Sequence, residues 1–303
     1  MSNIFDLLLS AASQGLLWSL MAIGVYLTFR ILDIADMTAE GSFPLGGGIA
    51  AICIVKGINP ILATIIAFLG GMIAGLVTGV LNTKLKIPSL LAGIITMTGL
   101  YSITSRVMGN AANVSLLGKN TVFTIAQNWG LSRNNAVIVI GLIISLLVIA
   151  LLVLFFRTEI GLAMRATGDN PDMSAANGIK TENMKILGYM ISNACIALSG
   201  ALLAQNNGFA DLNSGVGTIV IGLASIIIAE VLLRNKKIGI RLLTLVLGAI
   251  IYRFILALVF EMNVQPSDAK LASALVLVVC LSLPNLRLHR NKGGKNNAPS
   301  LKD

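Results

Sequence analysis

Charged side chains are scarce in this 303-residue chain, in which Asp, Glu, Lys and Arg together make up 12% of the residues. A soluble globular domain carries roughly 25% charged residues, so the composition argues against an ordinary soluble fold. Hydrophobic residues reach 56%, which is typical of a membrane protein. Cysteine is also rare: Cys53, Cys195 and Cys280 lie singly inside apolar segments, without the spacing of a metal site. We therefore expect all three to be small buried side chains.

Catalytic motifs are missing as well. The sequence contains no GxxxxGK(S/T), HExxH or GxSxG motif and no cluster of cysteine and histidine. The glycines at 46–48 lack the lysine and the strand–loop–helix setting that a phosphate cradle requires. The sequence thus predicts neither an enzyme nor a metal or cofactor site. Any ATP hydrolysis coupled to this chain must come from a partner protein.

Long apolar runs dominate the rest of the sequence. A bilayer crossing needs about 20 mostly apolar residues, and the runs predict an all-α, polytopic membrane protein surrounded by a lipid bilayer. We expect about nine transmembrane helices, within a range of about eight to ten because the second, seventh and ninth runs are short. The predicted spans are residues 5–28, 41–55, 60–81, 88–106, 136–156, 184–204, 217–233, 240–260 and 270–283.

The net charge of +9 comes from 22 basic and 13 acidic residues. The basic residues gather in loops between apolar runs rather than on one face, which indicates orientation in a membrane and no nucleic-acid partner. Those on one side of the predicted spans are Arg30, Lys84, Lys86, the segment 157–185, residues 234–241 and the tail from 287 onward. Because cytoplasmic loops carry the excess of basic residues, we expect the N-terminus outside and the C-terminus in the cytoplasm. Lys56, Lys119 and Arg133 depart slightly from this pattern.

The polar segment 157–185 interrupts two long apolar runs. Its capping residues predict two short helices in succession: Thr158 before the first, then Asp169 or Asn170 before the second, with Pro171 at its first position and Gly178 just past its end. Thr181 is predicted to cap the next apolar run. A compact pair of helices on the charged side of the membrane is suited to docking another protein.

Two stretches of the chain echo each other. ADMTAEG at 35–41 and ADLNSG at 210–215 are both followed by glycine-rich apolar residues, but the first follows an inward-running span and the second an outward-running one. Opposite directions of matching segments predict an inverted repeat. Pro44 with the glycines at 46–48, and Gly215 with Gly217, mark candidate breaks in membrane helices, which are tolerated where protein or a water-filled cavity satisfies the backbone.

Polar residues crowd these two candidate breaks. The candidates for a translocation path are Asp36, Thr38, Glu40, Asp211 and Asn213. The alternative is that Asp36 and Asp211 simply cap the helices that follow them, and capping can coexist with lining a path.

Three further features of the apolar runs allow structural predictions. Arg253 could extend to the membrane surface, pair with an acid such as Glu261, or face a cavity. Asn193 is predicted to make a hydrogen bond between helices. The glycines at 71, 75 and 79 predict close packing of two spans.

The polar segment also carries a family resemblance. GLAMRA at 161–166, followed by AANGI at 175–179, resembles the coupling loop of ABC-importer permeases, within the branch that includes the branched-chain amino acid and ribose permeases. DIADMTAEGSF at 33–43 is similar to a narrower group, the tryptophan/tyrosine-type permeases. The likeness extends over roughly residues 10–285.

This resemblance implies a transmembrane permease domain over residues 1–285, with a cytoplasmic coupling loop at 157–185, and a basic cytoplasmic tail at 286–303. It implies an ABC ATPase subunit, an extracellular substrate-binding lipoprotein, and a permease homodimer or a pair with a similar permease, in the bacterial plasma membrane. The implied substrate is an amino acid, aromatic by preference, with branched-chain amino acids, nucleosides and sugars as alternatives. The coupling residues it implies are Gly161, Arg165, Ala166, Gly168, Asn170, Met173, Ala176 and Gly178. An ion-coupled secondary transporter is the alternative class, although such a carrier does not need the loop.

Overall fold

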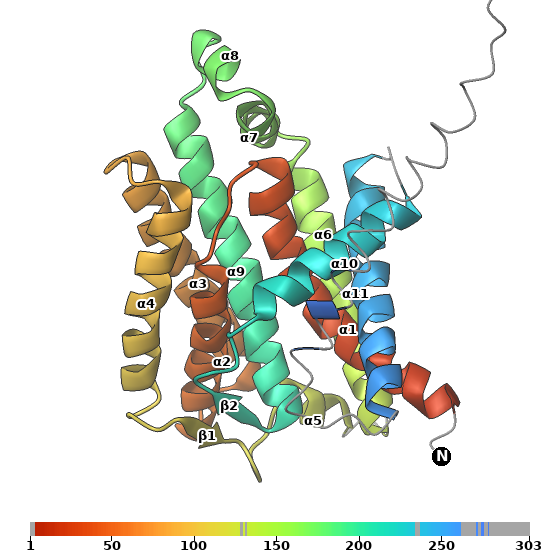
Figure 1. Cartoon of the computed structure of the whole chain (residues 1–303). Coiled ribbons are helices and arrows are strands. Elements are labelled where there is room, and N and C mark those ends of the chain that lie inside the picture. The colour runs from red at the N-terminus through yellow and green to blue at the C-terminus, as the bar shows by residue number, and fades with distance from the viewer. Residues whose placement is uncertain are drawn as a thin grey trace, which may run out of the picture.

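A computed structural model describes residues 4–127, 130, 132–233 and 237–261, together with the single positions 271, 274, 275 and 278. The chain forms a bundle of apolar helices, with two short helices at one end and a small sheet at the other (Figure 1). The apolar helices are α1 (Ile4–Tyr26), which continues as a π-helical turn η1 (Leu27–Ile31), α2 (Ala39–Val55), α3 (Pro60–Thr83), α4 (Ser89–Val107), α6 (Arg133–Phe155), α9 (Thr181–Asn207), α10 (Thr218–Leu232) and α11 (Ile238–Glu261).

Six of these helices are long and apolar enough to cross a membrane, and α2 and α10 are shorter apolar helices. Apolar side chains such as Leu69, Ile73, Leu147 and Leu151 are exposed along their outer faces, as expected where lipid replaces water as the solvent. The prediction of an all-α, polytopic membrane protein is confirmed. Of the predicted ninth span, at 270–283, only positions 271, 274, 275 and 278 are described, and the tail at 286–303 lies outside the described residues.

The remaining elements are short. α7 (Glu159–Asp169) and α8 (Pro171–Ala176) lie together at one end of the bundle (Figure 1). At the other end, β1 (Asn113–Ser115) pairs antiparallel with β2 (Phe209–Asp211), with Val114 opposite Ala210, and α5 (Val122–Gln127) lies at the same end. Within the described residues, these two strands are the only departure from an all-helical fold.

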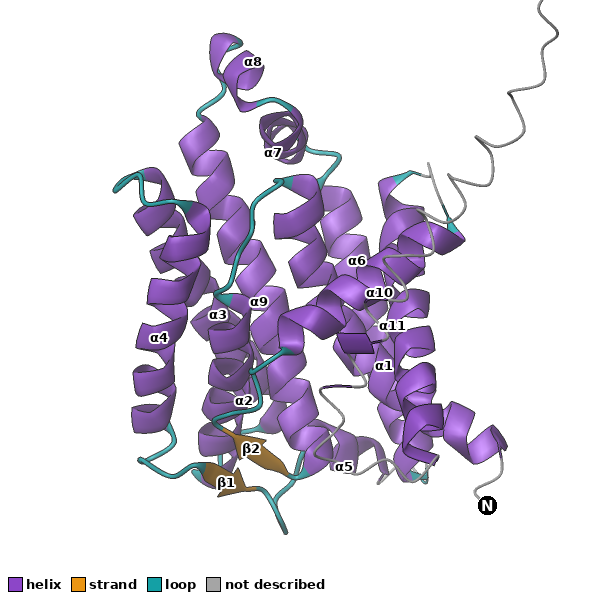
Figure 2. Cartoon of the chain, in the orientation of Figure 1, coloured by secondary structure: helices purple, strands orange, loops and turns teal. Residues whose placement is uncertain are grey.

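Two connections between membrane helices turn back into the bundle. After α1 reaches the α7–α8 end, the chain returns through residues 32–38 to the bundle interior, and α2 continues toward the opposite end (Figure 2). After α9 reaches that opposite end, the chain returns through β2 and residues 212–217, and α10 runs toward the α7–α8 end. Both connections are non-helical, as the predicted broken helices require.

Helix packing follows the same inverted pattern. α2 packs against α3 and α9, whereas α10 packs against α11 and α1. α3 packs against α9, and α11 packs against α1. If α1 is exchanged with α9, α2 with α10 and α3 with α11, the contacts of α2 and α3 become those of α10 and α11. Together with the opposite directions of α2 and α10, this exchange supports the inverted repeat predicted from the sequence.

The glycine face of α3 packs tightly on α9, as predicted. A Cβ atom at Gly71 would lie 2.4 Å from the carbonyl oxygen of Asn193, and one at Gly75 would lie 2.2 Å from that of Tyr189. Only glycine permits such an approach of two backbones.

One predicted helix break is wrong in position. α2 runs unbroken through Pro44 and the glycines at 46–48, and the break precedes it at residues 32–38. The glycines instead allow close packing, since a Cβ at Gly46 would lie 2.0 Å from the carbonyl oxygen of Ala197. Pro44 supplies no N–H for the carbonyl of Glu40, one helical turn earlier. The backbone of Gly215 packs against that carbonyl, because a Cβ there would lie 1.9 Å from the oxygen.

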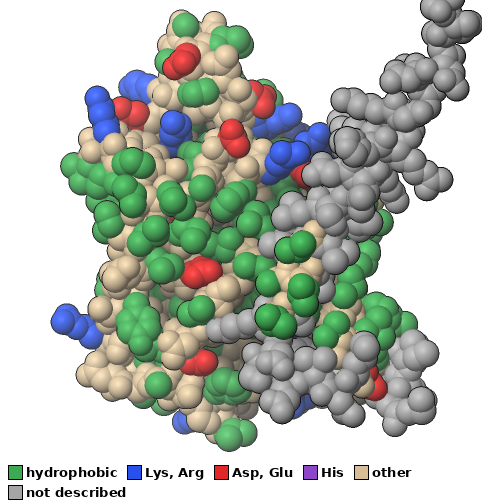
Figure 3. Space-filling model, viewed as in Figure 1, with side chains coloured by type: hydrophobic (Ala, Val, Ile, Leu, Met, Phe, Trp, Pro, Cys, Tyr) green, Lys and Arg blue, Asp and Glu red, His purple; other side chains and the backbone are tan. Residues whose placement is uncertain are grey.

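Basic side chains gather at the end of the bundle that carries α7 and α8 (Figure 3). Their positions at the ends of the helices and in the loops there are Arg30, Lys84, Lys86, Arg157, Arg165, Lys180, Lys185, Lys237 and Arg241. The opposite end carries Lys56, Arg106, Lys119 and Arg133. The asymmetry that the sequence suggested is therefore present in the folded chain.

Candidate coupling surface and translocation path

The segment 157–185, here called the coupling loop, folds as the capping residues predict. The Thr158 hydroxyl oxygen accepts from the N–H of Gly161 at 3.2 Å, at the start of α7. The Asn170 side-chain oxygen accepts from the N–H of Met173 at 2.9 Å, at the start of α8, and Pro171 is the first residue of that helix. Gly178 follows α8 with a φ of +80°, a conformation that glycine adopts without strain.

The predicted cap at Thr181 is wrong. Lys180 holds the N-cap position of α9 and makes no capping hydrogen bond through its side chain, and Thr181 is already helical. A threonine caps only from the non-helical residue that precedes a helix. Glu182, in the first turn of α9, forms an exposed ion pair with Lys84 at the end of α3, at 2.6 Å.

The predicted coupling residues divide into an inner and an outer set. Gly161 and Gly168 face the bundle: a Cβ at Gly161 would lie 2.2 Å from the carbonyl oxygen of Phe155, and one at Gly168 would lie 1.8 Å from that of Ile31. Ala166 is half-buried. The outer set is exposed, and it consists of Arg165, Asn170, Met173, Ala176 and Gly178. The inner glycines pack the loop against the membrane helices, and the outer residues are accessible to a partner.

The coupling loop is attached firmly to the membrane helices. Met164 on α7 is fully buried, and its sulfur lies near Gly188 on α9. Gly168 rests on the end of η1, and Ser174 on α8 is buried. A force applied to α7 and α8 would therefore reach the ends of α1 and α9, which belong to different halves of the inverted repeat.

Asp36 lies in a buried polar network in the first broken connection. Its side chain is 1% exposed. One carboxylate oxygen accepts from the N–H of Thr38 at 2.9 Å, and the other accepts from the Asn193 amide at 2.8 Å. The Asn193 oxygen in turn accepts from the hydroxyl of Ser42 at 2.7 Å. The prediction of an interhelical hydrogen bond at Asn193 is confirmed, and the Asp36 turn leads directly into α2.

Thr38 and Glu40 make further contacts around this connection. The hydroxyls of Thr38 and Thr78 are hydrogen-bonded at 2.8 Å, which joins α2 to α3. One Glu40 carboxylate oxygen accepts from the N–H of Gly217 at 3.0 Å. Since Gly217 precedes α10, Glu40 ties the start of α2 to the start of α10. The two non-helical connections are thus brought together.

Asp211 repeats the Asp36 turn in the second half, in a different environment. One of its carboxylate oxygens accepts from the N–H of Asn213 at 3.0 Å, two residues ahead, as at Asp36 and Thr38. Asp211 is half-buried and Asn213 is exposed. Turn formation is therefore observed at both aspartates. Neither aspartate caps the helix that follows it, because the N-cap positions of α2 and α10 are held by Thr38 and Gly217, and neither makes a capping hydrogen bond through a side chain. Of the five path candidates, Asp211 alone lines one of the two cavities described below.

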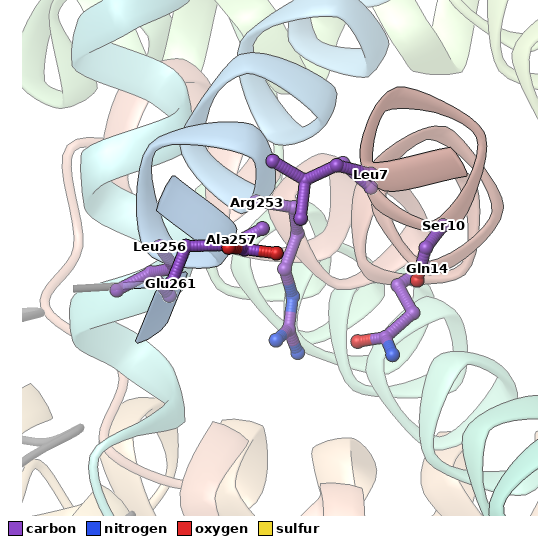
Figure 4. A pocket seen from close by; sticks show the side chains of 8 residues that line it. Leu7, Ser10, Gln14, Arg253, Leu256, Ala257 and Glu261 are labelled. Atoms are coloured by element: carbon purple, nitrogen blue, oxygen red, sulfur yellow. The ribbon is translucent and has the colours of Figure 1, made fainter. Parts of the chain in front are cut away.

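Two neighbouring cavities open between the halves. The smaller, of about 240 Å³, is here called the inter-half cavity. Its side chains come from both halves and include Gln14, Trp18, Phe43, Asp211, Ser214 and Arg253. The larger, of about 500 Å³, lies between α1 and α11 and shares Gln14 and Arg253 with the first. Figure 4 shows these two side chains extending into it from the two helices. Liquid water occupies about 30 Å³ per molecule, so the inter-half cavity has room for more than isolated waters.

Arg253 sits at the boundary of both cavities. Its guanidinium carbon lies 4.4 Å from the centre of the Trp18 ring, and Trp18 stacks on Phe43 with ring centres 5.2 Å apart. Among the three alternatives for Arg253, the structure thus supports the one in which it faces a cavity. Its Nε atom is buried and finds no acceptor among the described residues.

Sequence reasoning missed Gln14, Trp18 and Phe43 as cavity residues. Each lies in an apolar run that predicts only a membrane span, and the fold brings together helices that are distant in sequence. The one available signal was Arg253, because an arginine inside a membrane segment requires a special environment. Within the part of the chain that is described, no group of three His, Cys, Asp or Glu residues could hold a metal ion.

These features define a class of protein. Two inverted halves that enclose a polar cavity, with an exposed helical loop at one end, are the architecture of a membrane transport protein. Residues 7–282 match the family described as "Branched-chain amino acid transport system / permease component", and the chain belongs to this family. It is a multi-pass permease component of an ABC-type transport system.

The chain also resembles individual proteins. It is 40% identical over 294 residues to the tyrosine transport system permease protein of Clostridioides difficile (strain R20291), with 97% of each chain covered. It is 32% identical over 281 residues to an uncharacterized protein of Rickettsia prowazekii (strain Madrid E), with 91% of this chain and 97% of the other covered. Among solved structures, PsaBC from Streptococcus pneumoniae in complex with Fab aligns with a TM-score of 0.50 at 14% identity, covering 90% of this chain and 89% of that chain. The last likeness concerns the fold alone.

Proposed function

We propose that this chain forms the translocation path of an ABC importer for an amino acid with an aromatic side chain. In this proposal an extracellular binding lipoprotein delivers the amino acid, and a separate ATPase drives its passage. Two copies of the chain form the permease in the bacterial plasma membrane. The 40% identity to a tyrosine transport system permease supports the aromatic substrate, and the family description leaves branched-chain amino acids as the second candidate.

The observation that carries the coupling proposal is the shape of the α7–α8 end. α8 projects beyond the membrane helices (Figure 1), and its Met173 side chain is 61% exposed. An exposed apolar side chain on a helix outside the lipid-facing belt is suited to a groove on a partner protein. The basic residues gather at this same end (Figure 3), which supports a cytoplasmic position for α7 and α8. The N-terminus then lies outside the cell.

The inner and outer residues of the coupling loop have different roles in this proposal. Arg165, Asn170, Met173 and Ala176 meet the ATPase. Gly161 and Gly168 transmit its movement, because their backbones lie directly against the ends of α6 and η1. Asp36, Thr38 and Glu40 hold the starts of α2 and α10 together beside the path. Asp211 and Asn213 lie at its outward mouth.

An Ala176→Asp variant tests the coupling proposal. The added carboxylate would sit in the contact with the ATPase, where an unpaired charge is costly to bury. We expect ATP-driven uptake of L-tyrosine into proteoliposomes that hold the complete assembly to fall at least about tenfold, with membrane insertion unchanged. Leu85→Asp is the matched control, since Leu85 is 62% exposed at the same end in the loop between α3 and α4. It should leave uptake unchanged.

The same assay separates the alternatives. Normal uptake by Ala176→Asp would remove the coupling proposal. Uptake of L-leucine but not L-tyrosine by the native assembly would favour a branched-chain substrate. Uphill accumulation by the permease without an ATPase would show an ion-coupled secondary transporter instead.

A further inference from the structure

The inter-half cavity is lined by a positive charge, a negative charge and a pair of aromatic rings. Arg253 contributes a positive charge from α11, and Asp211 contributes a negative charge from β2. Trp18 from α1 and Phe43 from α2 contribute two stacked aromatic rings. A charge inside a membrane segment is costly and is retained where it has a partner or a function. Here both charges line one cavity.

Two residues that line the cavity, Arg253 and Trp18, each have a buried hydrogen-bond donor without an acceptor among the described residues. The Nε atom of Arg253 and the indole N–H of Trp18 are both buried, and neither has a partner among the described residues. Leaving a buried donor without a hydrogen bond is unfavourable. Because the guanidinium lies over the face of the Trp18 ring, its own N–H groups remain at its edge. A carboxylate is the acceptor that fits a guanidinium edge best, through two parallel hydrogen bonds.

The negative side of the cavity can receive a cation. One Asp211 oxygen is engaged by the N–H of Asn213, and the second oxygen has no hydrogen bond among the described residues. Asp211 is half-buried, so its carboxylate does not bear the full cost of burial. Ser214, on the turn that follows, lines the same cavity and adds a hydroxyl oxygen.

We infer that the inter-half cavity is a transit site for a zwitterionic amino acid with an aromatic side chain. The α-carboxylate binds the Arg253 guanidinium, the α-ammonium binds the Asp211 carboxylate, and the ring packs against Trp18 and Phe43. This inference rests on the proposed function and deepens it, because it assigns the recognition of the amino acid to the permease as well as to the delivering protein.

Binding can be read from Trp18 itself. The chain has two tryptophans, so a Trp129→Phe variant leaves Trp18 as its only indole. The purified full-length permease in lipid nanodiscs is titrated with L-tyrosine, with tyramine, which lacks the carboxylate, and with 3-(4-hydroxyphenyl)propionate, which lacks the ammonium. Excitation at the red edge of the indole absorption avoids emission from the ligands. We expect L-tyrosine to bind at least about tenfold more tightly than either analogue, since each analogue loses one charge-assisted contact.

Two substitutions then assign the contacts. Arg253→Gln should weaken L-tyrosine binding by about tenfold or more and leave tyramine binding unchanged. Asp211→Asn should weaken L-tyrosine similarly and leave the propionate unchanged, while its side-chain oxygen can still accept from Asn213. Arg106→Gln is the matched control, because Arg106 is exposed near the outward end of α4, and it should change neither affinity. Retained tyramine binding shows that the Arg253→Gln chain is folded.

Two results would overturn the inference. One is the absence of any change in Trp18 emission with L-tyrosine. The other is an equal loss of L-tyrosine and tyramine binding in Arg253→Gln, which would reveal a purely structural role for Arg253. Both results leave the proposed function intact, because ATP-driven uptake of L-tyrosine by the complete assembly is measured independently. A native assembly that fails to take up L-tyrosine would instead remove the proposed substrate.

Discussion

The same aspartate turn occurs once in each half of the molecule, in opposite surroundings. Asp36 and Asp211 each accept from the N–H two residues ahead, at 2.9 and 3.0 Å. Asp36 is 1% exposed and is held by Asn193 from α9, whereas Asp211 is half-buried and lines the inter-half cavity. The two halves thus share one local geometry, which has a different role in each half. In the first half it fixes a helix break, and in the second half it presents a carboxylate.

Solvation explains why the two tasks differ. A carboxylate that is fully buried must be compensated by hydrogen bonds, because the loss of its hydration is costly. Asp36 receives two hydrogen bonds, one from Thr38 at the start of α2 and one from Asn193 on α9. These bonds hold the connection at residues 32–38 against both helices. Asp211 keeps part of its hydration and needs no such network. It can therefore exchange water for a ligand without disturbing the fold.

The largest expected difference between the turns is in stability. Asp36→Ala leaves the Thr38 N–H without its acceptor and removes one acceptor of the Asn193 amide in the protein interior, so we expect the free energy of unfolding to fall by about 2–4 kcal/mol. Asp211→Ala should lower it by less than about 1 kcal/mol, because water can replace the lost contacts. The measurement is thermal unfolding of the detergent-solubilised permease without ligand. Equal losses in the two variants would abolish the distinction between the turns.

A smaller loss of stability is expected when the side chain two residues after each aspartate is changed. Thr38→Val keeps the side-chain shape but removes the buried hydrogen bond to Thr78, and we expect a cost of about 1 kcal/mol. Asn213→Ala, at the corresponding position of the second turn, changes an exposed side chain and should cost less than about 0.5 kcal/mol. The same unfolding experiment checks both. A larger loss for Asn213→Ala than for Thr38→Val would contradict the assignment of the first turn as the structural one.

Local features of this fold could be predicted from the sequence, and contacts across the bundle could not. The two caps depend on residues within one turn of helix: Thr158 was predicted correctly, and Asn170 was one of the two candidates for the second cap. The glycine face of α3 was also readable, because small residues spaced by four lie on one side of a helix. The prediction from Pro44 and the adjacent glycines failed, since α9 supplies the close packing that these glycines permit.

The candidate site shows the same division. Arg253 could be singled out because charges are rare in membrane segments, and Asp211 because its segment echoes residues 35–41. Trp18 and Phe43 could not be predicted as cavity residues, since an aromatic residue in an apolar run can equally well face lipid. In the coupling loop, the sequence predicted the two short helices but not which of their residues face the bundle. The carbonyl of Ile31 places Gly168 on the inner side, and that contact depends on how η1 ends.

The central claim of this account is that α7 and α8 face the cytoplasm and receive work from an ATPase. The most direct measurement is the accessibility of a cysteine at position 173, in a chain whose native cysteines at 53, 195 and 280 are replaced by alanine. A membrane-impermeant maleimide should label Met173→Cys in inside-out vesicles, and addition of the ATPase subunit should protect it. Labelling of Met173→Cys from the outside of intact cells would contradict the account.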